Sequence, residues 1–135
     1  MTGLKNEPTK DEQVLQHIIR YCDQIDTTIK GYKVTKVKFH DNFVLQNAIS
    51  MPLLQIGELT KKLSPGFREN NNEIPWKAWA GIRDRFAHNY NNMDIDVIWD
   101  TALNDIPKLN DYCKAILTEN AIPLPDKEEL SEIIK

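Results

Sequence analysis

Three side chains that could act on a phosphodiester lie within one stretch of eight residues, at Arg83, His88 and Tyr90. An arginine stays protonated and presents a planar fork to phosphate oxygens. A histidine titrates near neutrality and can move a proton. A tyrosine can hold a substrate by hydrogen bonding or stacking. No other part of the sequence offers a comparable cluster, so this stretch is the candidate active site.

RNA cleavage without a metal requires a base for the ribose 2′-hydroxyl, a cation for the phosphorane and an acid for the leaving 5′-oxygen. His88 suits the proton transfers, and Arg83 suits the charge. Asp84 lies four residues before His88, so on a helix it could orient the imidazole. On an ideal helix Arg83 and His88 diverge by about 140°. They converge only if the helix ends near His88 or if a second copy of the chain supplies half of the site.

A structural interpretation of the same residues stays open. A histidine near an arginine on a helix often makes only surface or interhelical hydrogen bonds. Asp84 could pair with Arg85 or His88 as surface electrostatics worth at most about 1 kcal/mol. Trp76 and Trp79 favour a place in a core or interface rather than a base-stacking role.

The composition indicates one globular domain over residues 1–135, with 41% hydrophobic and 27% charged residues. A net charge of -3 is unlike the basic footprint of a general nucleic-acid binder. A local basic segment nevertheless carries four lysines and no acid between positions 30 and 40. These lysines are candidate RNA-binding residues, although a solvated loop would have the same composition: Lys30, Lys33, Lys36 and Lys38.

The two cysteines, Cys22 and Cys113, fall within apolar-periodic segments and lack metal-type spacing. We therefore expect buried, reduced thiols, no metal site and no cofactor. The sequence after Met1 leads into no apolar run, and no stretch approaches the ~20 apolar residues of a membrane helix. These features predict a cytoplasmic protein without a membrane partner.

Apolar residues recur at helical spacing in four long segments, which predicts an all-α antiparallel four-helix bundle. The segments span about 11–30, 41–63, 76–88 and 95–117. Prolines predict kinks in the second and fourth helices, at Pro52 and Pro107. The core of the domain covers about 11–119, and 120–135 forms a tail.

Smaller features complete this description. We expect an extended loop over 32–39, closure of the second helix at Ser64-Pro65-Gly66 and a polar loop over 67–73. A short acidic tail helix is expected over 126–134. Inward positions of the second helix are expected to include Phe43, Val44 and Asn47.

The order arginine, four residues, histidine, one residue, tyrosine resembles the signature of HepT-like toxins, in the HEPN superfamily of small helical ribonucleases. The resemblance covers about Asp23 to Leu117. It extends to blocks on both sides of the motif, namely Ile56-Gly57-Glu58-Leu59, Leu63 to Arg68, Glu73 to Trp76, Asp94 to Trp99 and Asp105 to Leu109.

The resemblance implies a helical homodimer with the motif at the subunit cleft. It implies a metal-independent endoribonuclease, acting on cellular RNA as the toxin of a toxin–antitoxin pair, with Arg83 and His88 catalytic. The partner would be a nucleotidyltransferase antitoxin of the MNT type, which transfers AMP from ATP to Tyr90. Asp84 would be the supporting polar residue, and Glu58 matches a recurrent acidic position.

One alternative belongs to another functional class. The chain could be a non-catalytic module that binds a nucleotide or protein and only recruits the nucleotidyltransferase. Two departures from the family pattern bear on the shape of the cleft, namely Pro52 and the polar run Asn91-Asn92-Met93.

Overall fold

The structure, a computed structural model, describes residues 7–88 and 94–127, without the side chains at positions 83 and 85–88. It confirms the all-α class, since the described residues contain helices and no strand. The four long helices are α1 (Lys10–Gly31), α3 (Phe43–Thr60), α5 (Trp76–His88) and α7 (Ile106–Glu119). Three short helices connect them, namely α2 (Lys36–Asp41), α4 (Pro65–Asn70) and α6 (Ile95–Asp100).

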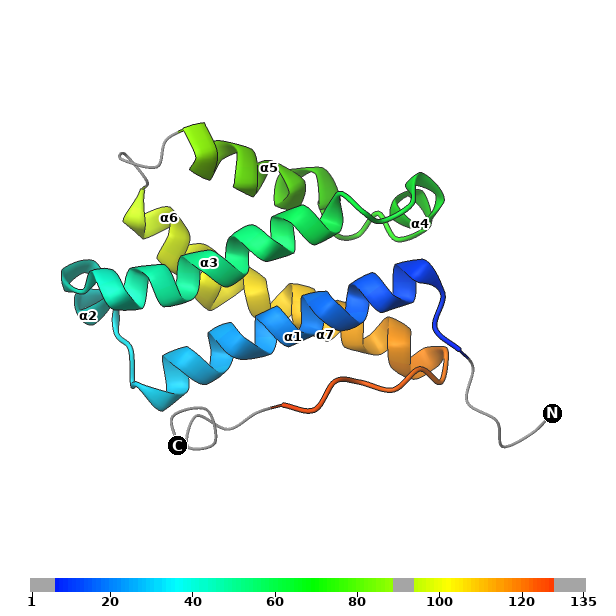
Figure 1. The fold of residues 1–135 in the computed structure, drawn as a ribbon, viewed down its shortest axis with the longest axis horizontal. Helices are drawn as coiled ribbons and strands as arrows, with labels where there is room; N and C mark the ends of the chain where they lie inside the picture. The colour runs from blue at the N-terminus through cyan, green and yellow to red at the C-terminus, as the bar shows by residue number, and fades with distance from the viewer. Residues whose placement is uncertain (1–6, 89–93, 128–135) are drawn as a thin grey trace.

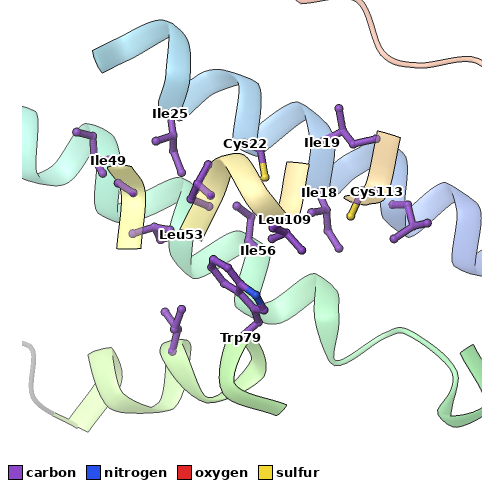
Figure 2. Close-up of a cluster of buried hydrophobic side chains, with 14 of the residues drawn as sticks. Ile18, Ile19, Cys22, Ile25, Ile49, Leu53, Ile56, Trp79, Leu109 and Cys113 are labelled. Atoms are coloured by element: carbon purple, nitrogen blue, oxygen red, sulfur yellow. The ribbon is translucent and has the colours of Figure 1, made fainter. Parts of the chain in front are cut away.

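Helix α3 lies at the centre of this arrangement, between α5 on one side and α1 on the other (Figure 1). Helix α1 packs in turn on α7. The apolar stripes of all four long helices meet in one core (Figure 2). Trp79 of α5 reaches toward Ile56 of α3 there, and Cys22 and Leu109 join α1 to α7. This burial fixes the helix that carries the candidate motif against α3.

Helix α1 begins at a capping box. The Thr9 hydroxyl accepts from the Glu12 N–H at 3.1 Å, and the Glu12 carboxylate accepts from the Thr9 N–H at 2.9 Å. This arrangement satisfies two helix-end donors. Its apolar stripe then buries Leu15, Ile18 and Cys22 completely. The predicted first helix is therefore confirmed to within a residue or so at each end.

The expected extended loop over 32–39 is wrong, because its second half forms α2. Thr35 caps this helix by accepting from the Lys38 N–H at 3.2 Å. Phe39 is fully buried and its ring centroid lies 5.4 Å from that of Trp99. Two apolar residues of this segment, Val34 and Phe39, are buried, whereas Val37 is 71% exposed.

The expected polar loop over 67–73 is also wrong in its first half. Ser64 does not close a helix but caps α4, since its hydroxyl accepts from the Phe67 N–H at 3.2 Å. Pro65 occupies the first turn, where its missing N–H costs nothing. Asp11 fixes Ser64 from α1, accepting from its hydroxyl at 2.6 Å and from its N–H at 2.8 Å.

Phe43, Val44 and Asn47 are exposed, contrary to the expectation that they face inward. The core stripe of α3 runs through Ile49, Leu53 and Ile56. At about 100° per residue, positions 43, 44 and 47 lie on the opposite side of the helix from that stripe. Helix α3 itself continues through the predicted kink site, since Pro52 is buried within it.

The fourth predicted helix is divided by a π-helical segment, Thr101–Asp105, between α6 and α7. The N–H of Ile106 donates to the carbonyl of Thr101, five residues back. Pro107 has no N–H to donate to the carbonyl of Leu103. The irregularity thus lies in the turn before the proline, whose ring is accommodated at the start of α7.

Residues 120–127 form no helix and run beneath α1 (Figure 1). The Gln16 side-chain amide donates to the Pro123 carbonyl at 3.0 Å, and Ile122 is buried. Asp26 of α1 pairs with Lys127. The expected tail helix is therefore absent at 126 and 127, and its remaining residues lie outside the described ones.

Both cysteines are free and fully buried, which confirms the expectation of reduced core thiols. Burial raises the pKa of Cys113 to about 12. It also raises the pKa of Cys22, and the neighbouring Cys113 and Asp23 add to that rise. In the described part of the chain, no helix has the length and apolar character to span a membrane.

Candidate functional site

Helix α5 positions the motif, and its start is built around two tryptophans. The Pro75 carbonyl accepts from the N–H groups of Ala78 and Trp79 at 3.0 and 3.2 Å. The indole of Trp76 donates to the Asn71 carbonyl at 2.9 Å. Trp76, Trp79 and Ile82 are all buried. The tryptophans therefore anchor the helix, which confirms the core interpretation of these residues over the stacking one.

The backbone is helical from Trp76 through His88. The positions of Arg83 and His88 are consequently about 140° apart around the axis of α5, as an ideal helix requires. Their side chains and the whole of Tyr90 lie outside what the structure describes. The predicted contact between Asp84 and His88 stays a prediction for the same reason.

Asp84 is exposed and is held by a lysine from the end of α3. The Nζ atom of Lys61 lies 3.2 Å from Oδ1 of Asp84 and 3.7 Å from Oε1 of Glu58. Glu58 and Lys61 are three residues apart, so they share one face at the end of α3. Sequence reasoning considered Glu58 but missed Lys61. The three-residue spacing of Lys61 from Glu58 is visible in the sequence, but its contact with Asp84 depends on how α3 and α5 pack.

Two of the candidate RNA-binding lysines are close to the end of α1. Lys30 lies 3.2 Å from the Asp26 carboxylate, one helical turn earlier. Burial alone raises the pKa of Asp26, but hydrogen bonds from Lys127 and Lys30 outweigh it and lower that pKa. Lys33 has a positive φ of 51° and its carbonyl accepts from the Lys38 ammonium at 3.3 Å.

Lys36 of α2 forms a second cluster with α6. Its ammonium lies 3.6 Å from the Asp96 carboxylate, and Nε2 of His40 lies 2.8 Å from the same oxygen. The hydrogen bond from His40, together with the charges of Lys36 and His40, lowers the pKa of Asp96. The fold therefore adds acids to a segment that contains none in sequence, which lowers its net positive charge.

Helices α2 and α6 lie at the same end of the molecule as the last turn of α5 (Figure 1). The cluster of Lys36, His40 and Asp96 thus belongs to the end of the bundle where the motif helix stops. Lys30 lies in the last turn of α1, and Lys33 lies just after that helix. The four lysines therefore do not form a continuous stripe along one element.

A groove of about 400 Å³ opens between α5 and the start of α7. Its lining combines apolar side chains with polar groups at the rim, and these residues are Glu73, Ile74, Pro75, Ala78, Trp79, Ile82, Thr101, Asp105, Lys108, Leu109 and Tyr112. The π-helical segment supplies Thr101 and Asp105. Sequence reasoning did not find this groove, because its two walls, residues 73–82 and 101–112, are separated in the chain by the end of α5 and by α6.

A second cavity, of about 330 Å³, lies between α1 and α7 and is lined by both charged and apolar side chains. At its wall the buried carboxylate of Asp23 accepts from Asn110 at 2.9 Å and from Lys114 at 3.2 Å. The described residues contain no group of acidic, histidine or cysteine side chains arranged to hold a metal ion.

Comparison with known proteins identifies the family of the chain. Residues 18–116 match the ribonuclease HepT-like family. "Putative RNase TTE0752" of Caldanaerobacter subterraneus subsp. tengcongensis is 37% identical over 103 residues, or 76% of this chain and 90% of the relative. "Putative RNase MJ1216" of Methanocaldococcus jannaschii is 31% identical over 113 residues, or 83% of this chain and 92% of the relative.

"Probable ribonuclease HepT" of Thermococcus cleftensis is 39% identical over 64 residues, or 47% of this chain and 58% of the relative. No solved structure matches the chain. The helical bundle, with Arg83 and His88 on one anchored helix, defines the class as a small helical protein of the HEPN type. More particularly, the chain belongs to the ribonuclease HepT-like family.

Proposed function

We propose that this protein is a metal-independent endoribonuclease that acts on cellular RNA as the toxin of a toxin–antitoxin pair. The observation that carries the proposal is the placement of the Arg83 and His88 positions on one continuous helix, anchored by buried tryptophans, in a chain of this family. The names of its relatives, which refer to RNases, support the same reaction class.

In the proposed reaction, His88 takes the proton from the ribose 2′-hydroxyl, and the 2′-oxygen attacks the adjacent phosphorus. The bond to the 5′-oxygen breaks, and that oxygen receives a proton from an acid. The products are a 2′,3′-cyclic phosphate and a free 5′-hydroxyl. Arg83 stabilises the additional negative charge on the phosphorane, as a fixed cation does in other phosphoryl transfers.

The site is completed by a second copy of the chain in this proposal. The backbone of α5 stays helical through His88, so positions 83 and 88 lie about 140° apart around its axis and one helix does not present both to the same phosphate. A two-fold axis beside α5 would bring Arg83 of one copy toward His88 of the other. It would also supply two imidazoles, one as base and one as acid.

Control of the activity is proposed to act through Tyr90. A nucleotidyltransferase antitoxin of the MNT type would catalyse attack of the Tyr90 phenol oxygen on the α-phosphorus of ATP, with release of pyrophosphate. The added AMP brings a negative charge close in sequence to Arg83 and would compete with RNA for that cation. The candidate lysines Lys30, Lys33, Lys36 and Lys38 would contact the RNA backbone away from the cleaved bond.

The test is cleavage of end-labelled total RNA by the unmodified protein in EDTA, with the His88→Ala and Arg83→Ala variants alongside. We expect cutting by the wild type and a loss of about 10² to 10⁴ in rate for His88→Ala, with unchanged helical circular dichroism. If the wild type and both variants leave RNA intact, and the intact mass of the wild type shows that Tyr90 is unmodified, the binding-module alternative replaces this proposal.

The control step has its own test. Incubation with MNT and ATP should raise the mass of the wild-type protein and leave Tyr90→Phe unchanged. Equal modification of Tyr90→Phe would contradict the assignment of Tyr90.

A further inference from the structure

We infer that the groove between α5 and α7 binds a nucleobase that carries an exocyclic amino group, within the single-stranded RNA that this protein is proposed to cleave. The inference rests on the proposed function only for the identity of the polymer. The character of the bound base follows from the groove itself, from its size, its walls and the charges at its rim.

The size of the groove matches one nucleotide rather than a polypeptide segment. Its volume of about 400 Å³ lies at the small end of the range for small-molecule sites. Trp79, Ile82 and Leu109 are buried in its wall, and Ile74 and Tyr112 are half-buried. Trp79 stays a core residue that closes the bottom of the groove, and the half-buried ring of Tyr112 supplies the flat surface on which an unstacked base can be held.

The Tyr112 ring is fixed in place before any ligand arrives. Its hydroxyl donates to Oδ1 of Asn71 at 3.3 Å. Its ring lies 6.5 Å from that of Trp76, nearly edge-on at 70°. Burial, followed by the nearby charge of Glu73, raises the pKa of Tyr112. The aromatic wall is therefore neutral and rigid, which reduces the entropy cost of binding a flat ligand.

The charges at the rim select among bases. Glu73 and Asp105 are two carboxylates against the single ammonium of Lys108. All three residues are exposed, so their charged groups can be reached by a ligand. A carboxylate accepts readily from an exocyclic amine such as N4 of cytosine. Uracil has no such amine, and two carboxylates would repel a phosphate placed between them.

The groove adjoins the motif along α5. Ile82 lines it and directly precedes Arg83, while Ala78 lies about 7.5 Å along the axis from position 83. A base held here would therefore belong to a nucleotide close to the phosphate that Arg83 is proposed to clamp. Lys108 at the rim would contact an adjoining phosphate. The π-helical segment that supplies Asp105 is a type of irregularity often found at functional sites.

Binding is measured with labelled oligonucleotides that cannot be cleaved, because their 2′-hydroxyl is methylated. Homopolymers of cytidine, adenosine and uridine are titrated into the full-length protein in EDTA. We expect the cytidine or adenosine oligomer to bind at least about tenfold more tightly than the uridine oligomer. Equal affinity for all three would overturn the inference.

Two variants in the groove and one matched control outside it locate this preference. Ala78→Phe fills the groove from an exposed helix position, and Lys77→Phe places the same ring on α5 outside the groove. Ala78→Phe should lower the affinity for the preferred oligomer about tenfold, while Lys77→Phe should bind it with the affinity of the wild type. Asp105→Asn adds no bulk and should reduce the difference between bases. If Ala78→Phe and Asp105→Asn both bind the oligomers with the affinity and base preference of the wild type, the assignment of the groove is refuted.

Cleavage of total RNA, measured in parallel, separates this inference from the proposed function. A wild type that cuts RNA, with unchanged oligomer binding by Ala78→Phe, contradicts the groove alone. A wild type that does not cut RNA but binds bases selectively, with loss in Ala78→Phe, supports the groove and contradicts the ribonuclease. Loss of nucleotidyltransferase binding in Ala78→Phe, with oligomer binding intact, would make the groove a protein site and overturn the inference.

Discussion

The Nζ atom of Lys61 lies 3.2 Å from Oδ1 of Asp84 and joins the end of α3 to the exposed side of α5. The carboxylate next in sequence to Arg83 is thus paired with a cation from another helix. Glu58, 3.7 Å from the same ammonium, extends the contact along α3. Lys61 therefore balances negative charge close to the position where a phosphate is proposed to bind.

Replacing this lysine should affect activity more than folding. We expect Lys61→Met to lower RNA cleavage about fivefold, the equivalent of about 1 kcal/mol, because Asp84 would then repel the substrate. The free energy of unfolding should change by less than about 1 kcal/mol, since the pair is exposed. Lys62→Met, an exposed neighbour, is the control. Equal loss of cleavage in both variants would point to general charge rather than to the Asp84 contact.

The buried polar group on α1 and α7 should contribute to stability. Asp23→Leu leaves the Asn110 amide without its hydrogen-bond acceptor and should cost about 1–3 kcal/mol in urea unfolding. The double variant with Asn110→Leu should recover part of that loss, because both buried polar groups are then removed. Asp111→Leu, on the exposed side of α7, should be close to neutral. A double variant less stable than Asp23→Leu would contradict this explanation.

Acid should loosen the contact between α2 and α6. His40 and Lys36 lower the pKa of Asp96 from its usual 3.8, so this carboxylate stabilises the fold fully above that value. The contribution is lost as the pH falls through the lower pKa of the folded state. The protection factors of the α2 amides in hydrogen exchange, which correct for the intrinsic effect of pH, should therefore fall at low pH in the wild type and be reduced already at neutral pH in Asp96→Asn. Asp100→Asn serves as the control, and an equal fall in it would exclude the His40 contact as the cause.

The two thiols should be unreactive in the folded protein. Cys22 and Cys113 are fully buried, and burial raises the pKa of both. At pH 8 we expect no alkylation by iodoacetamide over minutes in buffer and complete alkylation in denaturant, followed by mass spectrometry. Rapid labelling without denaturant would show that the α1–α7 contact opens locally.

The periodicity of apolar residues was sufficient to predict the four long helices, because each buries a stripe spaced by three and four residues. It failed at α2 and α4, whose six residues are too few to show a period. Their capping residues, Thr35 and Ser64, were the available signals. Ser64 followed by Pro65 is a start signal for a helix and not a stop.

The candidate site was predictable in identity but not in geometry. The residue types and the spacing of Arg83 and His88 are local properties of the sequence. The contact of Lys61 with Asp84 spans 23 residues and depends on the phase at which α3 and α5 pack. The groove likewise requires the π-helical segment, which no local pattern before Pro107 indicated.

That segment also gives the chain a place where its length can change. A π-helical turn holds one residue more than the α-helical turn it replaces. When that residue is deleted, the helices on either side can keep the same side turned toward the core. Deletion of Leu103 should leave a folded protein, whereas deletion of Val97 in α6, also 45% exposed, should turn Asp96 away from His40. Thermal unfolding of the two deletion variants compares them directly. Insertions and deletions among relatives of this protein are then expected to concentrate in this segment at the rim of the groove. One residue more or less there alters the width of the groove without disturbing the core.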